Sequence, residues 1–232
     1  MKYIIFGANS DIAFELSKIL IKNNCEILLA SRNSEELKNK ETFLNEKSNK
    51  PVKSYCVDIQ KNQDLNKFLD YLKKDIYHLI ICSGYMEVPE INHKKIMDIN
   101  FEGPKNLIEK IINSSEVNIN KISCITSVAS DRQDYRKKSY SLAKRRLSEF
   151  LKLKSENLKT EGIIIQNIKP GYVYTKMTRD IKLPRILVIN SKTAAKKIFK
   201  NLNTNNKNIY IPFFWKYILV LYNLLFKIKV LK

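Results

Sequence analysis

Short apolar runs alternate with amphipathic stretches along most of this chain. The first run, residues 2–6, is rich in β-branched and aromatic residues and predicts a buried strand. It is followed by apolar residues at helical spacing, Ile12, Leu16 and Leu20, which predict a helix. The alternation continues to residue 211, so we expect strands and helices to follow one another in turn.

The whole pattern predicts seven strands with six helices between them. The strands are expected at residues 2–6, 26–30, 52–57, 76–82, 121–126, 163–168 and 208–211. The helices are expected at about 12–20, 34–47, 65–72, 92–113, around Tyr140, and at 194–202. Strands that are apolar on both faces and alternate with helices are typical of a parallel, doubly wound α/β sheet with helices on each side. Ligands of such sheets bind beyond the carboxyl ends of the strands.

The 232 residues are expected to form one domain followed by a separate helix. No Pro-, Gly- or Ser-rich linker or repeat divides the chain, which is long enough to bury a sizeable core. We place an α/β domain at residues 1–212 and an apolar, basic helix at residues 213–232. The first apolar run ends at Phe6, too early for a signal peptide, so a cytoplasmic protein is expected.

Cysteine and histidine usage predicts neither disulfides nor a metal site. The cysteines are far apart, form no CxxC pair and lie mostly in apolar runs; they are Cys25, Cys56, Cys82 and Cys124. We expect them to be buried thiols in a reducing compartment. With only His78 and His93 present, a histidine-rich metal centre is not expected.

The net charge of +19 allows two interpretations. Strong basicity can indicate nucleic acid or an anionic membrane as the partner. Here the excess is spread along the chain rather than gathered into one arm, which favours a membrane or a phosphorylated ligand, and no nucleic-acid partner is expected. The alternative is that a lysine-rich composition merely covers solvated faces.

Tyr140 and Lys144 are the first candidates for chemistry. They lie four residues apart in a stretch that predicts a long helix, so their side chains share one face. An ammonium close to a phenol favours the phenolate and lowers a pKa that is about 10 in a free tyrosine. Such a pair can act as a general acid or base. Because this spacing is common by chance, the hypothesis depends on the residues around the pair.

A turn suited to a dinucleotide follows the first strand. Gly7 would let the backbone approach a pyrophosphate, and the helix behind it would supply N–H donors, although Asp11 and Ala13 stand where glycines are more usual. At the end of the second strand, Ser31 and Arg32 offer a hydroxyl and a guanidinium where a ribose without a phosphate would require an acid. We therefore expect NADP(H) as the cofactor in preference to NAD(H).

These features resemble the short-chain dehydrogenase/reductase family over nearly the whole chain. Residues 7–13 look like its glycine turn, and Asp58 looks like the acid that meets the adenine. Asn100 matches the asparagine of the helix after strand four. Residues 82–84, Cys-Ser-Gly, stand where the family has Asn-Ala-Gly and depart from it at the first two positions.

The resemblance extends to the second half of the chain. Ser127 lies thirteen residues before Tyr140, as the family's catalytic serine does before its tyrosine. Residues 170–175 match the Pro-Gly…Thr segment that holds the nicotinamide carboxamide. All five glycines of the chain also fall where family members commonly have one.

The resemblance implies a three-layer Rossmann fold and hydride transfer between NADP(H) and a ketone or secondary alcohol. Tyr140 would be the general acid or base, and Ser127 would bind the substrate oxygen. Lys144 would hold the ribose and lower the tyrosine pKa, and Asn100 would bind a water of a proton relay. The residues implied to bind the cofactor are Gly7, Asn9, Ser10, Asp11, Ile12, Arg32, Asp58, Ile59, Ser83, Gly84, Tyr140, Lys144, Pro170, Gly171, Val173 and Thr175. A homo-oligomer is also expected.

The segment after the last predicted strand is apolar and basic. Between Phe213 and Lys227 nearly every residue is apolar, and Lys216, Asn223 and Lys227 share one stripe of a helix. The ten residues between Lys216 and Lys227 would extend about 15 Å, which is too short to cross about 30 Å of hydrocarbon. We expect this helix to lie in the interface of an anionic membrane. The alternative is a helix buried against the domain or a partner subunit.

The tail and residues 9–13 are similar to those of short-chain reductases of cell-surface polysaccharide pathways, one branch of which reduces a keto-sugar carried on a polyprenyl phosphate. This implies a lipid- or nucleotide-linked sugar as substrate and a peripheral position on the inner face of the cell membrane. The short segment 176–190 is expected to cover the substrate with apolar and basic side chains. The alternatives are a cytosolic reductase of small carbonyls or 3-oxoacyl thioesters, and a non-catalytic NADP-binding sensor.

Overall fold

A seven-stranded parallel sheet forms the centre of the protein, in strand order β3-β2-β1-β4-β5-β6-β9. The computed structural model describes residues 1–72, 75–87, 89–132 and 138–230, the last four of these as backbone. The strands are β1 (Lys2–Phe6), β2 (Glu26–Ser31), β3 (Val52–Cys56), β4 (Ile76–Ile81), β5 (Asn118–Ile125), β6 (Ile164–Pro170) and β9 (Asn208–Ile211). Every neighbouring pair is parallel. The predicted doubly wound α/β fold is therefore confirmed.

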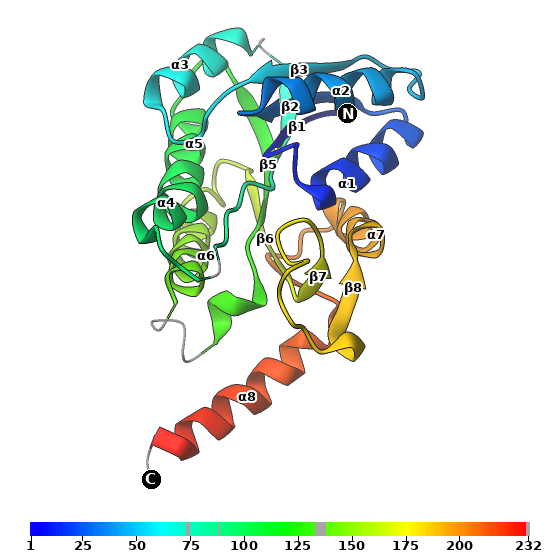
Figure 1. The fold of residues 1–232 in the computed structure, drawn as a ribbon. Helices are drawn as coiled ribbons and strands as arrows, with labels where there is room; N and C mark the ends of the chain where they lie inside the picture. The colour runs from blue at the N-terminus through cyan, green and yellow to red at the C-terminus, as the bar shows by residue number, and fades with distance from the viewer. Residues whose placement is uncertain (73–74, 88, 133–137, 231–232) are drawn as a thin grey trace.

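Helices cover both faces of this sheet, as Figure 1 shows. They are α1 (Asp11–Lys22), α2 (Ser34–Asn45), α3 (Asn62–Tyr71), α4 (His93–Met97), α5 (Gly103–Ile112), α6 (Ser139–Asn157), α7 (Ser191–Leu202) and α8 (Trp215–Val230). The core on one face is shared with α3, α5 and α6, and the core on the other with α1, α2 and α7. The sheet is thus the middle of three layers.

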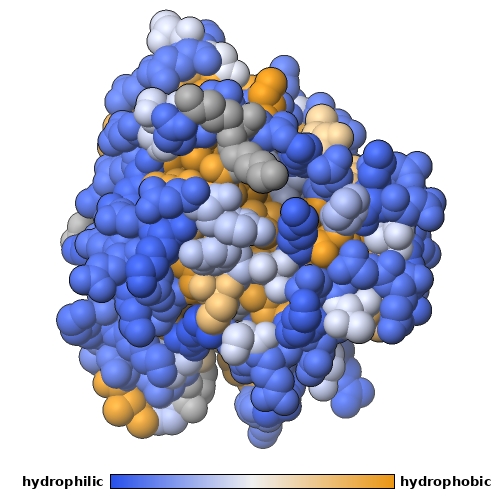
Figure 2. All heavy atoms as spheres, turned by 90° about the horizontal axis from the view of Figure 1, so that it is seen from above, coloured by the Kyte–Doolittle hydropathy of each residue, from blue (hydrophilic) through white to orange (hydrophobic). Residues whose placement is uncertain are grey.

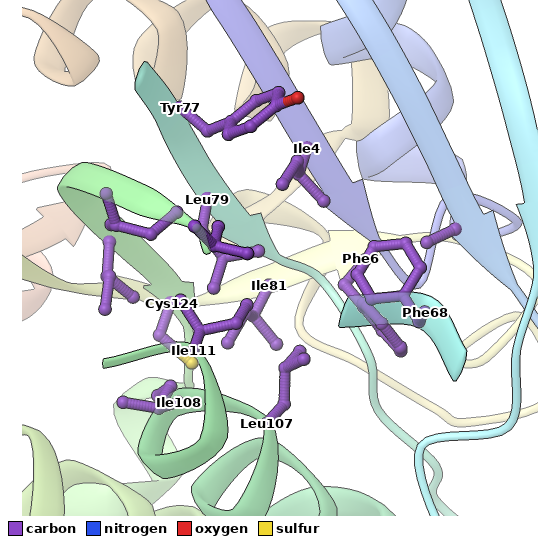
Figure 3. Close-up of a cluster of buried hydrophobic side chains, with 14 of the residues drawn as sticks. Ile4, Phe6, Phe68, Tyr77, Leu79, Ile81, Leu107, Ile108, Ile111 and Cys124 are labelled. Carbon is purple, nitrogen blue, oxygen red and sulfur yellow. The ribbon is translucent and has the colours of Figure 1, made fainter. Parts of the chain in front are cut away.

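The strands read as apolar on both faces because alternate side chains enter different cores. Ile4 and Phe6 of β1 point to the α3–α5–α6 side, whereas Tyr3 and Ile5 point to the other. Figure 3 shows the first core, in which side chains of β1, β4 and β5 meet those of α3 and α5. Phe6 and Phe68 contact edge to face with ring centroids 5.5 Å apart. Most of the surface that Figure 2 shows is hydrophilic, and apolar side chains appear mainly in a central recess.

The structure differs from the predicted elements in several places. The expected helix 92–113 is divided into α4, a π-helical turn at Asp98–Glu102, and α5. Two short strands, β7 (Tyr172–Tyr174) and β8 (Val188–Asn190), pair outside the main sheet and were not predicted, because each is only three residues long. Cys56 is exposed, so the expectation of buried thiols holds only for the other three cysteines.

Helix α8 begins on the domain and leads away from it (Figure 1). Trp215 and Leu219 are buried and pack with Val128 in a small third core. On the opposite side of the helix, large apolar side chains are exposed; these are Tyr217, Val220, Leu221, Leu224 and Leu225. Among the described residues, none of the helices has the length and hydropathy needed to cross a membrane.

Candidate active site

A cleft of about 380 Å³ lies beyond the carboxyl ends of the central strands. Every residue predicted to bind the cofactor lines it, and so do the predicted catalytic residues Ser127, Tyr140 and Lys144. Asn100 is the one predicted site residue that does not line the cleft. The parallel arrangement explains this gathering, because the loops that follow each strand meet at one edge of the sheet.

Tyr140 lies in the first turn of α6, where a carboxylate satisfies the free end of the helix. The backbone N–H groups of Ser139 and Tyr140 donate to the two carboxylate oxygens of Glu90, over 2.8 and 3.3 Å. A helix N-terminus leaves such N–H groups without partners inside the helix, and an acid there also complements the helix dipole. Glu90 therefore fixes the end of α6 that carries Tyr140.

The side chain of Ser127 lies near the Tyr140 phenol and acts on its pKa. Burial raises the pKa of Tyr140, and the effect of Ser127 is in the opposite direction but does not outweigh it. The Ser127 oxygen also accepts a hydrogen bond from the N–H of Ala129, over 3.1 Å. Serine and tyrosine, thirteen residues apart in the chain, therefore lie near each other in the wall of the cleft.

Lys144 lies one turn after Tyr140 and is almost completely buried. Its Nζ atom is 5.9 Å from the centroid of the Tyr140 ring and 3.4 Å from the carbonyl oxygens of Ser83 and Ile125. Burial lowers the pKa of Lys144 to about 8. The expectation that this lysine brings the tyrosine pKa below its ordinary value is not met by the protein residues alone, because burial dominates at Tyr140.

Asn100 supports the site from behind rather than facing the cleft. Its Nδ2 donates to the carbonyl oxygens of Tyr85 and Ile96 over 2.6 and 2.8 Å, and its Oδ1 accepts from the N–H of Tyr85 over 3.2 Å. It lies within the π-helical turn, so one side chain joins this turn to the loop after β4. A Cβ atom on Gly84 would lie 3.4 Å from Asn100 Oδ1 and 3.5 Å from Lys144 Nζ. The water-relay role of Asn100 remains a prediction.

The glycine turn is closely packed against neighbouring backbone. Gly7 has φ of 78°, and a Cβ atom there would lie 2.5 Å from the backbone nitrogen of Ser83. The Gly7 N–H donates to the carbonyl of Ala30 over 2.8 Å. A side chain would therefore be strained and would collide with the backbone of Cys82 and Ser83, directly after β4.

Two buried polar atoms in the cleft have no partner among the described residues. They are Asn9 Oδ1 and Ser83 Oγ, and both residues line the cleft. The Nδ2 of Asn9 donates to the carbonyl of Asn33 over 3.1 Å, which fixes the amide. Because buried polar groups are nearly always hydrogen-bonded, these two atoms fit a polar ligand such as a dinucleotide. Arg32, which follows β2, is exposed and also lines the cleft.

The family of this chain follows from a match over most of its length. Residues 2–185 match the family model described as short chain dehydrogenase. The chain belongs to the short-chain dehydrogenase family. It is accordingly an oxidoreductase of the class that interconverts CH–OH and C=O groups. No match was found among curated proteins.

Solved structures of short-chain dehydrogenases have the same fold. A short-chain dehydrogenase from Sphingobium yanoikuyae in complex with NADPH has a TM-score of 0.77 at 17% identity, covering 91% of this chain and 88% of that chain. RhlG of Pseudomonas aeruginosa in an active-site complex with NADP has a TM-score of 0.74 at 19% identity, covering 90% and 94%. A short-chain dehydrogenase from Burkholderia cenocepacia in complex with NADP has a TM-score of 0.73 at 18% identity, covering 90% and 86%.

In this short-chain dehydrogenase, Lys176 contacts acids of α1 and α2 that also line the cleft, and the sequence does not indicate these contacts. We refer to them as the clasp. The backbone N–H of Lys176 donates to Asp11 over 2.6 Å, and Lys176 Nζ donates to Glu36 over 2.8 Å. Lys40 also donates to Glu36, over 2.9 Å. Burial acts to raise the pKa of Glu36, but these hydrogen bonds outweigh it, so that pKa lies below its ordinary value. Because the partners are up to 165 residues apart, no local pattern indicates the clasp.

Proposed function

We propose that this protein interconverts a ketone and a secondary alcohol with NADP(H), using Tyr140 as the general acid or base. The observation that carries the proposal is that Ser127, Tyr140 and buried Lys144 line one cleft, with Ser127 close enough to the phenol to act on its pKa. A proton donor and an oxygen-binding hydroxyl are thereby brought to one point, as carbonyl reduction requires.

The cleft fits NADP(H) at both of its ends. The Asn9 and Ser83 oxygens, which lack a partner within the described part of the chain, and the closely packed Gly7 turn suit a dinucleotide. Arg32 offers a guanidinium to a 2′-phosphate. The Sphingobium, Burkholderia and Pseudomonas proteins named above were solved with NADPH or NADP. When bound, NADPH supplies the hydride for reduction of the carbonyl carbon.

The protein residues manage the proton and the developing charge. Tyr140 would donate its phenolic proton to the carbonyl oxygen, and Ser127 would donate a hydrogen bond to the same oxygen. With a pKa of about 8, Lys144 is mostly protonated at neutral pH and would stabilise the phenolate left behind on Tyr140. Asn100 would hold a water molecule that returns protons to this pair.

The substrate that we favour is a keto-sugar of cell-surface polysaccharide synthesis, carried on a lipid or a nucleotide. Support comes from the C-terminal region, since residues 181–232 contain eleven lysines and arginines and no aspartate or glutamate. The charge is therefore concentrated toward the C-terminus, which corrects the expectation of an even spread. A reductase of small carbonyls or 3-oxoacyl thioesters remains the second candidate, since the same catalytic residues would serve it.

The exposed face of α8 supports membrane contact through residues 213–232. Tyr217, Val220 and Leu224 are exposed on one side, while Asn223 on the other side donates to the carbonyl of Asp131 over 2.8 Å. The polar stripe thus turns toward the domain at Asn223, and an apolar stripe is left outward. An apolar face on a basic segment fits an anionic lipid surface at the inner side of the cell membrane.

Replacing Tyr140 by phenylalanine tests the proposed reaction. The variant lacks the proton donor but keeps the ring, so it should bind NADPH with a Kd within about twofold of the parent and lose at least about a hundredfold in turnover. NADPH oxidation at 340 nm against a panel of keto-sugars and small ketones would measure this and identify the substrate class. Unchanged turnover would overturn the assignment.

Membrane contact is tested by a charge placed on the exposed face of α8. Val220→Asp and Leu224→Asp should each reduce pelleting with vesicles that contain phosphatidylglycerol, because a carboxylate opposes both burial and the anionic surface. Leu153→Asp introduces the same change at an exposed leucine of α6 and is the matched control. Equal pelleting of all four proteins, parent included, would contradict the contact, and dimerisation through α8 would then be examined by sedimentation.

A further inference from the structure

Asp131 lies at a buried junction of elements that meet behind the cleft. Its carboxylate accepts hydrogen bonds from Lys169 Nζ over 2.7 and 2.8 Å and from the Tyr210 hydroxyl over 2.6 Å. The side chain of Lys169 is 7% exposed and that of Asp131 is 16% exposed. Burial and the carboxylate raise the pKa of Tyr210, so it donates as a neutral phenol. Residues of β6 and β9 therefore hold one carboxylate in place.

Asp131 ends the short turn that begins at Ser127. We refer to residues 127–131 as the serine turn. Within it, the N–H and the hydroxyl of Ser130 both donate to the carbonyl of Ser127, over 3.1 and 2.7 Å, and Val128–Asp131 form one turn of 3₁₀-helix. Because these hydrogen bonds connect the two ends of the serine turn, we expect a displacement of Asp131 to displace Ser127 as well.

The other partner of the ion pair also lies next to the site. Lys169 directly precedes Pro170 and Gly171, which line the cleft. The Lys169–Asp131 pair thus joins the turn that carries Ser127 to the end of β6. Helix α8 adds to the junction, because Asn223 donates to the carbonyl of Asp131 and Trp215 packs on Val128.

We propose that Asp131 is a positioning residue, which through its ion pair with Lys169 holds the Ser127 hydroxyl against Tyr140 in the orientation that the reaction needs. This inference rests on the proposed function, since it requires Ser127 to bind the substrate oxygen. The desolvation cost of a buried ion pair offsets much of its attraction, and in some proteins such a pair serves to fix geometry. Misplacing a catalytic group by about 1 Å can lower the reaction rate by about a hundredfold.

The test is a double-mutant cycle between Asp131→Asn and Ser127→Ala. Asp131→Asn keeps the shape of the side chain and removes its charge, so kcat should fall at least about tenfold while the KM for NADPH stays within about twofold. In the Ser127→Ala background the same substitution should change kcat less than about twofold, because there is no longer a hydroxyl to position. Glu26→Gln, which neutralises one of the two acidic partners of Lys2 at the surface, is the control and should leave kcat unchanged.

The outcomes separate this inference from the proposed function. Normal turnover in Ser127→Ala would overturn the proposed function itself. If kcat falls in Ser127→Ala, two results would overturn the positioning role alone. One is a normal kcat in Asp131→Asn, and the other is an equal loss of kcat from Asp131→Asn in both backgrounds. If Asp131→Asn does not fold, Tyr210→Phe replaces it in the cycle. That variant keeps the ion pair and removes one donor, and its smaller loss of kcat should likewise vanish in the Ser127→Ala background.

Discussion

His78 should make the protein less stable in mildly acidic solution. The ring is buried at the centre of β4, and burial, followed by the charge of Lys121, lowers the pKa of His78 from 6.5 to about 3. Between these two values the unfolded chain binds a proton that the folded protein excludes. The free energy of unfolding therefore falls as the pH falls through this range.

The size of the effect follows from the two pKa values. At pH 7.5 the histidine is neutral in both states and contributes almost nothing. At pH 5.0 the histidine of the unfolded chain is protonated and that of the folded protein is not, which lowers the free energy of unfolding by about 2 kcal/mol. The position is otherwise well satisfied, since His78 Nε2 lies 2.7 Å from Ser123 Oγ, which in turn donates to Gln166 over 2.7 Å.

His78→Gln tests this account, because glutamine offers an N–H donor of similar reach and does not titrate. Urea unfolding followed by circular dichroism at pH 7.5 and 5.0 should show that the wild type loses about 2 kcal/mol more than the variant between the two conditions. His93→Gln, at the exposed histidine of α4, should leave the loss as in the wild type. Parallel losses in the wild type and His78→Gln would show that protonation of His78 in the unfolded chain is not the source of the pH dependence.

Three further substitutions have expected outcomes. Gly7→Ala should cost about 2 kcal/mol of stability and weaken NADPH binding, because its Cβ would lie 2.5 Å from the Ser83 nitrogen. Thermal unfolding and NADPH fluorescence would measure both effects, and a neutral result would contradict the close approach. Arg32→Glu should reverse the cofactor preference by about tenfold or more in kcat/KM for NADPH over NADH, and an unchanged ratio would remove Arg32 from phosphate binding. Phe68→Ala should lower the free energy of unfolding by about 3–5 kcal/mol, measured by urea, since the ring is fully buried against Phe6; a loss below 1 kcal/mol would be inconsistent with that packing.

The fold could be predicted because its signals are local and repeated. Each strand of the main sheet reads as a short apolar run, and each run is separated from the next by a helical stripe. The cleft residues could also be predicted, since loops after parallel strands gather at one edge and the family resemblance indicated Ser127 from its spacing to Tyr140. Strand ends were less well defined, as β5 begins at Asn118 and β6 continues to Pro170.

Contacts between distant residues could not be predicted. The Lys176–Glu36 clasp and the Lys169–Asp131 pair join residues whose separation in the chain carries no pattern. The balance of charges at the tyrosine was also beyond the sequence, because the effect of Lys144 depends on how deeply both side chains are buried. Spacing shows which groups can meet, whereas burial decides which protonation state is favoured.

The indole ring of Trp215 fills the space in which a side chain at position 171 would lie. A Cβ atom on Gly171 would lie 1.8 Å from Trp215 Nε1, so the backbone of the cleft and the first residue of α8 interlock. A side chain at position 171 therefore requires a smaller residue, or a displaced ring, at position 215. In evolution or in engineering the two should therefore change together. The first residue of α8 consequently limits which residues can replace Gly171 in the lining of the cleft, although Trp215 does not itself line the cleft.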